Sequence, residues 1–160
     1  MSSSNRRSEP RRRRIDSYPF VHELRSQFRD MDVLGHVNNV VIGAWFEDAR
    51  AHFLRHHLGG GNPDHRSRHR VVANVEIDYL DEVLHPRAYR IGAGVLRVGT
   101  TSVTVSLALF AAGVGLGDGG GEMCHALCDA TLVTVEGHTP VPVSDAERET
   151  LTALRTPFSS

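Results

Sequence analysis

One long helical pattern, from about Asn38 to Leu58, constrains the fold of this chain more than any other feature of its sequence. Apolar side chains recur in it every three or four residues and form one continuous stripe: Ile42, Trp45, Phe46, Ala49 and Phe53. The side that carries Asp48, His52, Arg55 and His56 is predicted to face solvent. The glycines at 59–61, followed by Asn62 and Pro63, end the helix. Because a helix with a single apolar stripe must bury it against another layer, the pattern predicts a sheet beneath it.

Strand-length runs rich in Val, Ile, Leu and Thr supply that sheet: Val21–Phe28 before the helix, then Val71–Leu80, Ala88–Val98, Ser102–Ala111 and Met123–Val135. Residues 99–101 and the glycine cluster at 113–121 read as hairpin turns, so the last four strands are expected to form an antiparallel meander. The pattern Ser144-x-x-Glu147 is a capping box and predicts a short helix to about Leu154. The fold class expected is therefore α+β, with one long helix on one face of the sheet.

The first residues differ in composition from the rest of the chain. All 18 basic residues are arginines, and six of them fall within residues 1–17. We expect residues 1–17 to be a disordered, solubilising tail and residues 18–160 to be one folded domain, since 160 residues suit a single domain. A basic tail can also contact nucleic acid, a membrane or an acidic partner. We expect neither nucleic acid nor a membrane to be a partner.

Cellular location is indicated by what the sequence does not contain. No stretch approaches the roughly 20 consecutive apolar residues that span a bilayer, and the polar start does not match a secretory signal. Cys124 and Cys128 lie four apart in an expected strand, which would place them on one face and about 13 Å apart. We therefore expect free thiols and a cytoplasmic protein.

The segment that carries chemistry runs from Phe28 to Asn39, with the sequence FRDMDVLGHVNN. It places two carboxylates and a histidine in a loop that feeds the N-terminus of the long helix. The first amides of a helix have no acceptor within it and lie at the positive end of its dipole, so they can bind an oxyanion. The alternative is that Asp32 or Asn38 only caps the helix.

This segment resembles the one that opens the central helix in the 4-hydroxybenzoyl-CoA thioesterase-like family of the hotdog superfamily, with the pattern D-x-D-x-x-G-H-V-N-N. Further matches follow in the same order along the chain: Trp45–Arg50, Glu76–Leu80, Arg97–Ser102 and Pro140–Val143. The resemblance covers about residues 20–154. It implies a hotdog fold, in which an antiparallel β-sheet wraps around one long central helix.

The resemblance also implies an activity, the hydrolysis of an acyl thioester carried on coenzyme A or an acyl carrier protein. Asp32 matches the family's catalytic carboxylate, as nucleophile or general base, and the backbone N–H of Asn39 would bind the thioester carbonyl. His36 and Glu47 are further catalytic candidates. The expected substrate-binding residues are Gly35, Val37, Asn38, Tyr79, Thr101 and Ser102. No metal and no cofactor is implied, apart from coenzyme A as part of the substrate.

Glu47 lies on a third helix face, among Val40, Gly43, Ala44 and Ala51. A carboxylate among small apolar residues is expected to be partly buried and to need an ion-pair or hydrogen-bond partner. The alternative is a direct role near the thioester.

Two other activities are known for this kind of fold, an enoyl-thioester hydratase and a non-catalytic acyl-CoA-binding protein. The hydratase needs D-x-N-P-x-H, whereas Asp32 and His36 are one residue too close and lack the Asn-Pro pair.

The residues 84–87 and the long glycine turn depart from the family pattern, which leaves the choice of carrier open. Exposed sheet edges predict self-association as a dimer or tetramer.

Overall fold

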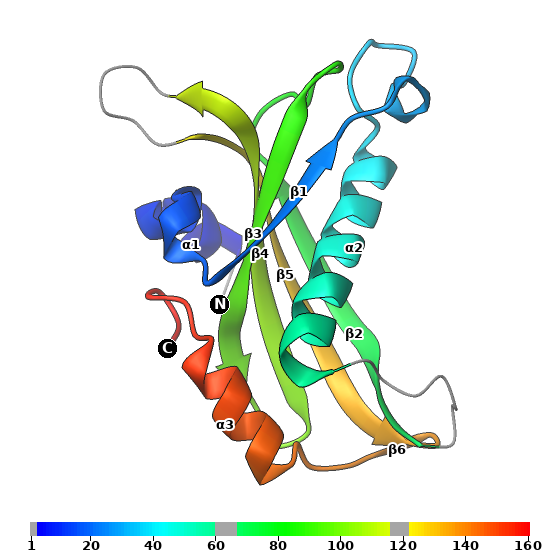
Figure 1. Ribbon diagram of the computed structural model, residues 1–160, viewed down its shortest axis with the longest axis vertical. Coiled ribbons are helices and arrows are strands. Elements are labelled where there is room, and N and C mark those ends of the chain that lie inside the picture. The colour runs from blue at the N-terminus through cyan, green and yellow to red at the C-terminus, as the bar shows by residue number, and fades with distance from the viewer. Residues whose placement is uncertain (1–2, 60–66, 116–121) are drawn as a thin grey trace.

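The computed structural model describes residues 3–59, 67–115 and 122–160 (Figure 1). Six antiparallel strands form one sheet: β1 (Phe20–Arg25), β2 (Arg68–Tyr79), β3 (Ala88–Val98), β4 (Ser102–Gly115), β5 (Glu122–Glu136) and β6 (Thr139–Pro140). The helices are α1 (Ser3–Ser8), α2 (Asn39–Leu58) and α3 (Asp145–Ala153), with short 3-10 turns η1 (Pro10–Arg13), η2 (Ile15–Ser17) and η3 (Phe28–Asp30). The α+β class is confirmed. Part of the glycine turn, residues 116–121, lies outside the described residues.

The strand order is β1-β3-β4-β5-β2, with β6 beside β5. The strands β3, β4 and β5 form the expected meander, but the prediction that β2 precedes β3 in it was wrong. β2 pairs with β5 instead, and β1 takes the place beside β3. As a result β2 lies at an edge of the sheet, and its side chains Val71, Val72 and Val75 are 42%, 47% and 43% exposed.

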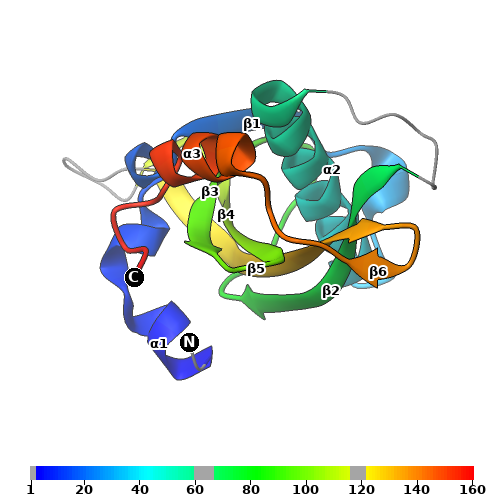
Figure 2. The same ribbon diagram turned by 90° about the horizontal axis from the view of Figure 1, so that it is seen from below.

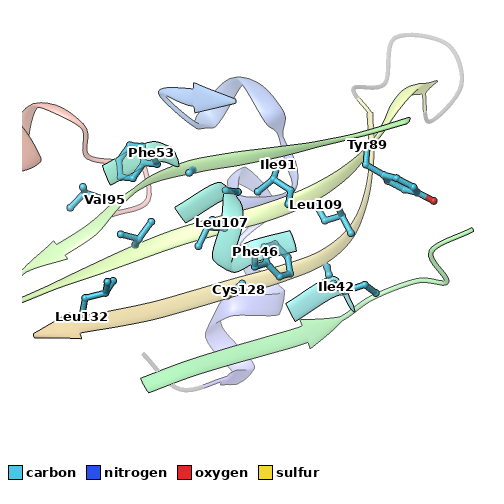
Figure 3. Close-up of a cluster of buried hydrophobic side chains, with 14 of the residues drawn as sticks. Ile42, Phe46, Phe53, Tyr89, Ile91, Val95, Leu107, Leu109, Cys128 and Leu132 are labelled. Carbon is cyan, nitrogen blue, oxygen red and sulfur yellow. The ribbon is translucent and has the colours of Figure 1, made fainter. Parts of the chain in front are cut away.

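The helix α2 lies across the inner face of the curled sheet, as Figures 1 and 2 show. The Asn38 side chain caps it by accepting a hydrogen bond from the Val40 N–H at 2.9 Å, and Gly59 ends it with a φ of 82°. Four residues of the predicted stripe are buried: Ile42, Phe46, Ala49 and Phe53. They pack on strand residues that include Ile91, Leu107, Leu109 and Cys128 (Figure 3), so the main core lies between α2 and the sheet.

We call the side on which α2 runs beside β2 the α2–β2 seam. The Ile77 side chain approaches Gly43 across it, and the Tyr79 O–H reaches the Asn39 carbonyl oxygen at 3.2 Å. Val40, on the same side of α2, is 79% exposed. No element in the described part of the chain covers the seam, so its two ends are open to ligands or to another protein.

The opposite, outer face of the sheet is covered by the N-terminal segment, which differs from the disordered tail that we expected. Arg12 is fully buried there, and its Nη1 donates to Asp129 Oδ1 at 2.8 Å and to Ser106 Oγ at 3.1 Å. Arg6 pairs with Asp78. Burial alone would raise the pKa of Asp78, but hydrogen bonds from Arg6 and Arg7 outweigh it and hold this pKa below its usual value. Arginines that compositional reasoning assigned to solvent thus neutralise carboxylates on the sheet.

An apolar cluster completes this outer face, made of Tyr18, Leu96, Ala108, Phe110, Leu127 and Phe158. Cys124 packs against it, whereas Cys128 belongs to the inner core. A register shift between Leu109 and Phe110 against β5 places the two thiols on opposite faces, so the prediction of a shared face was wrong. Both cysteines are free.

The predicted helix start at Ser144 is confirmed, because the Ser144 side-chain oxygen accepts a hydrogen bond from the Glu147 N–H at 3.3 Å and caps α3. The reciprocal half of the predicted capping box is not formed, since the Glu147 carboxylate pairs with Arg70 instead. Among the described helices, none is both long enough and apolar enough to cross a membrane.

Candidate active site

The loop before α2 is organised around the Asp32 carboxylate. Its Oδ1 accepts hydrogen bonds from the N–H of Leu34 at 2.9 Å and of His36 at 3.3 Å. The backbone closes the same turn, since the Asp32 N–H donates to the His36 carbonyl at 2.8 Å and Gly35 adopts a φ of 81°. The other oxygen, Oδ2, has no hydrogen-bond partner in the residues that the structure describes. One oxygen therefore holds the loop, and the other is available to a bound molecule.

Asp30, two residues earlier, has a different role. It is 9% exposed, and its Oδ2 accepts a hydrogen bond from the Gln27 N–H at 2.7 Å. Its carbonyl oxygen accepts from the Asn38 N–H at 2.8 Å and so connects η3 to the cap of α2. Both hydrogen bonds are internal, which makes Asp30 a structural residue of the loop.

The first residue of α2, Asn39, presents its backbone beside Asp32. The Asn38 side chain satisfies the N–H of Val40, while the N–H of Asn39 has no acceptor within the described chain. The Tyr79 O–H donates to the Asn39 carbonyl and ties β2 to the helix end. Burial raises the pKa of Tyr79, so the phenol remains protonated and able to donate at neutral pH.

These groups open into a cleft of about 460 Å³ at one end of the α2–β2 seam. Its lining residues are Asp32, Leu34, His36, Val37, Asn39, Ile42, Tyr79, Leu80, Asp81, Glu82 and Val83. The Nε2 of His36 lies 3.4 Å from Glu82 Oε2. Since its lining includes three carboxylates and no lysine or arginine, we call this hollow the acidic cleft. No sequence pattern pointed to Asp81 and Glu82, because they follow β2 in an irregular loop.

The cleft collects most of the residues that the sequence proposed. Asp32, His36, Val37, Asn39 and Tyr79 line it directly. Gly35 lies in the Asp32 turn, and Asn38 caps the helix beside it. The structure thus brings together residues that are 47 positions apart, from Asp32 to Tyr79.

Thr101 and Ser102 do not line the cleft of their own chain. Ser102 pairs with Val133, which pairs with Val71 near the start of β2, whereas Tyr79 lies at the end of that strand. Eight residues of strand correspond to roughly 26 Å. The two residues therefore lie at the far end of the sheet.

Glu47 also lies outside the cleft. It is exposed on α2 and has no ion-pair or hydrogen-bond partner in the described chain, which differs from the partly buried and paired side chain that we expected. The reason is that none of the residues that the structure describes covers this face of α2. Glu47 lines a second hollow further along the seam. In the ranges 3–59, 67–115 and 122–160, no three His, Cys, Asp or Glu side chains are grouped so as to hold a metal ion.

The sequence and the fold have clear relatives. The model of the thioesterase-like superfamily matches residues 26–151. The Bacillus subtilis protein YsmA, described as uncharacterized, is 29% identical over 142 residues, which cover 87% of this chain and 89% of YsmA.

Two solved structures are similar over nearly their whole length. The PA5185 protein of Pseudomonas aeruginosa is 28% identical, with a TM-score of 0.77 over 92% of this chain and 99% of that one. A thioesterase of Thermus thermophilus, in complex with coenzyme A and Zn, is 29% identical, with a TM-score of 0.70 over 87% and 96% of the two chains.

Proposed function

Because this chain belongs to the thioesterase-like superfamily, we propose that it is an acyl thioesterase that hydrolyses a thioester of the coenzyme A type. The antiparallel sheet curled around α2 is the hotdog fold, so the fold that the resemblance implied is confirmed. The observation that carries the proposal is the pairing of two unsatisfied groups in one cleft. These are the free carboxylate oxygen of Asp32 and the free backbone N–H of Asn39.

In the proposed reaction the thioester carbonyl oxygen accepts a hydrogen bond from the Asn39 N–H at the positive end of α2. That contact stabilises the negative charge that develops on this oxygen. Asp32 then either attacks the carbonyl carbon, forming a mixed anhydride that water hydrolyses, or takes a proton from a water that attacks it. In both routes the C–S bond breaks and the products are a free acid and a thiol. The thiolate leaves readily, because a thiol has a pKa of only about 8.5.

Coenzyme A is the carrier that the comparisons favour. The Thermus thermophilus thioesterase, which shares 29% of its residues with this chain, was solved with coenzyme A bound. An acyl carrier protein has the same pantetheine arm and remains the alternative carrier. A pantetheine thioester is therefore the substrate class to test first.

We also propose that the protein works as a dimer built on the α2–β2 seam. The edge strand β2 exposes three valines, and unpaired strand edges favour association with another strand. A two-fold axis near the middle of β2 would place the start of one β2 beside the end of the other. The Thr101 and Ser102 of the partner would then approach the acidic cleft, which agrees with their predicted role in substrate binding. Size-exclusion chromatography with light scattering tests this, and a fully active monomer would contradict it.

The test of the function is a hydrolysis panel of aryl, short-chain and long-chain acyl-CoA thioesters, with release of free thiol as the readout. We expect at least one class to be hydrolysed. We expect no hydration of enoyl-CoA, so any loss of this compound should be matched by release of thiol. Binding of every thioester without hydrolysis would instead favour the acyl-CoA-binding alternative. Hydration of enoyl-CoA would favour the hydratase.

A further inference from the structure

A second hollow, of about 320 Å³, lies on the α2–β2 seam beside the C-terminal half of α2. Its lining residues are Glu47, Arg50, Ala51, Leu54, Arg55, Gly59, Arg70, Val72 and Leu132. Three of these are arginines and one is a carboxylate, so we call it the arginine groove. Its charge is opposite to that of the acidic cleft at the other end of the seam.

Arg50 is the unusual residue of this groove. It is only 6% exposed, yet its guanidinium has no hydrogen bond or ion pair with any of the described residues. Glu47, one helical turn earlier, does not come within ion-pair distance of it. The side chain is largely buried, but its guanidinium nitrogens stay accessible from the groove, since none of them is among the fully buried unpaired polar atoms of the described residues. A charge in such an enclosed place is normally paired. Arg50 therefore has no negatively charged partner among the described residues, and a ligand in the groove can supply one.

Its neighbours make the groove suitable for an oxyanion. Arg70 keeps its place through an ion pair with Glu147 at 2.9 Å, and it faces the same groove. Arg55 is exposed at the rim. A guanidinium offers several N–H donors in a planar array that matches a phosphate or a carboxylate. Two further arginines beside Arg50 add attraction over a longer distance.

The acidic cleft explains why such a receptor is needed. Asp32, Asp81 and Glu82 line it, so the cleft repels the negative charges of a coenzyme A thioester. Within one chain about 16 Å of helix separates Asn39 from Arg50. In the two-fold dimer the seam of the partner runs in the opposite direction, which places the arginine groove of one protomer beside the acidic cleft of the other.

We propose that Arg50, together with Arg55 and Arg70, binds an anionic group of the thioester substrate. This group is either a phosphate of the carrier or a carboxylate at the far end of the acyl chain. The inference rests on the proposed thioesterase function. In the dimer, the arginine groove of one protomer binds the anionic group of a substrate whose thioester lies in the acidic cleft of the partner.

Four substrates separate the two sources of the anion: butyryl and succinyl thioesters, each carried on coenzyme A and on N-acetylcysteamine, which has no phosphate. Arg50→Gln should raise KM about 10- to 100-fold for the substrates that bear the recognised anion, with kcat nearly unchanged. If the anion is a carrier phosphate, both coenzyme A thioesters are affected. If it is the acyl carboxylate, both succinyl thioesters are affected. Arg50→Lys, which keeps the charge, should restore part of the affinity.

Variants outside the groove control for a general effect. Arg25→Gln removes an exposed arginine from β1, at the opposite edge of the sheet, and should leave KM unchanged. If Arg50→Gln does not fold, Arg55→Gln changes an exposed side chain of the same groove and should show the same substrate selectivity at about threefold. An equal change for all four substrates, or dissociation of the dimer without a change in KM, would overturn the proposal.

Direct binding separates this inference from the proposed function. Calorimetry with inorganic pyrophosphate and with succinate should show that one of them binds to the wild-type protein and binds at least tenfold more weakly to Arg50→Gln. Absence of hydrolysis of every thioester would overturn the thioesterase proposal and leave this binding result intact. If each probe binds equally well to the wild type and to the variant, the proposed role of the arginine groove is wrong, whatever the hydrolytic activity.

Discussion

Arg12 and Arg50 both have largely buried side chains, but they lie on opposite sides of the sheet and in opposite electrostatic surroundings. Arg12, on the outer face, is fully buried and donates to Asp129 and Ser106. Arg50, on the α2–β2 seam, is 6% exposed and pairs with no carboxylate in the described chain. The same side chain, buried to nearly the same degree, is thus satisfied by the protein in one place and has no partner among the described residues in the other.

The difference extends to the groups around each arginine. On the outer face, Arg6 and Arg12 satisfy Asp78 and Asp129, so that surface is closed by the chain itself. On the seam, a carboxylate oxygen of Asp32 and the N–H of Asn39 also lack partners among the described residues. Polar groups that stay unsatisfied within the protein need an explanation, and a bound ligand or a catalytic role is one. The comparison therefore predicts a stabilising role for the outer face and a functional role for the seam, and three substitutions test that division.

The largest effect is expected at the acidic cleft. Asp32→Asn keeps an oxygen that can accept from the Leu34 and His36 N–H groups but removes the reactive carboxylate. We expect kcat to fall by about 10²–10⁴ while the melting temperature changes little. Steady-state kinetics and thermal unfolding measure the two quantities.

Asp30→Asn is the matched control for this change. It removes the same charge two residues away, where the carboxylate accepts from the Gln27 N–H inside the loop. We expect it to lower the melting temperature more than Asp32→Asn and to cost far less activity. If Asp32→Asn were nearly as active as wild type, the assignment would be wrong, and His36 would be the next candidate in the cleft.

The second effect is expected on the outer face and in stability alone. Arg12→Met keeps the length of the side chain but leaves the Asp129 carboxylate without its 2.8 Å partner. Removing one partner of a buried charged group costs about 1–3 kcal/mol when a second partner remains, and Arg6 still lies 3.3 Å from Asp129, so the free energy of unfolding in urea should fall by that amount. The kcat of the folded protein should stay within about twofold. Arg13→Met changes an exposed neighbour and should alter neither the free energy of unfolding nor kcat. A large loss of kcat in folded Arg12→Met would show that the outer face takes part in chemistry.

The smallest effect concerns the charge of the acidic cleft. Glu82 is 64% exposed at its rim, and Glu82→Gln removes one of the charges that repel an anionic substrate. We expect KM for a coenzyme A thioester to fall about two- to threefold at low ionic strength, and the difference to vanish at high salt because exposed charges are screened. Measuring KM against salt concentration tests this, with Glu149→Gln on α3 as the control. An unchanged KM at low salt would contradict the idea that the negative charge of the acidic cleft weakens substrate binding.

Much of the candidate site was determined by the sequence alone, because its contacts are local. The Asp32 turn, the Asn38 cap and the start of α2 lie within eight residues of one another, and their hydrogen bonds depend on spacing and residue type. The stripe of α2 and the bounds of β3 follow in the same way from periodicity. For this reason the conformation of the candidate loop could be predicted before its surroundings were known.

Only the tertiary structure decided which charges meet and which remain unpaired. The pairing of β2 with β5 leaves one sheet edge free and creates the seam, and no residue within β2 specifies that partner. Packing of residues 3–17 on the outer face brings Arg12 to Asp129, 117 positions away, while Arg50 is left without a partner in the described chain. Contacts between distant segments depend on strand order and on what covers each face. Residue type and local spacing do not contain that information, so an arginine expected in solvent became structural and Arg50 became a candidate for binding the substrate.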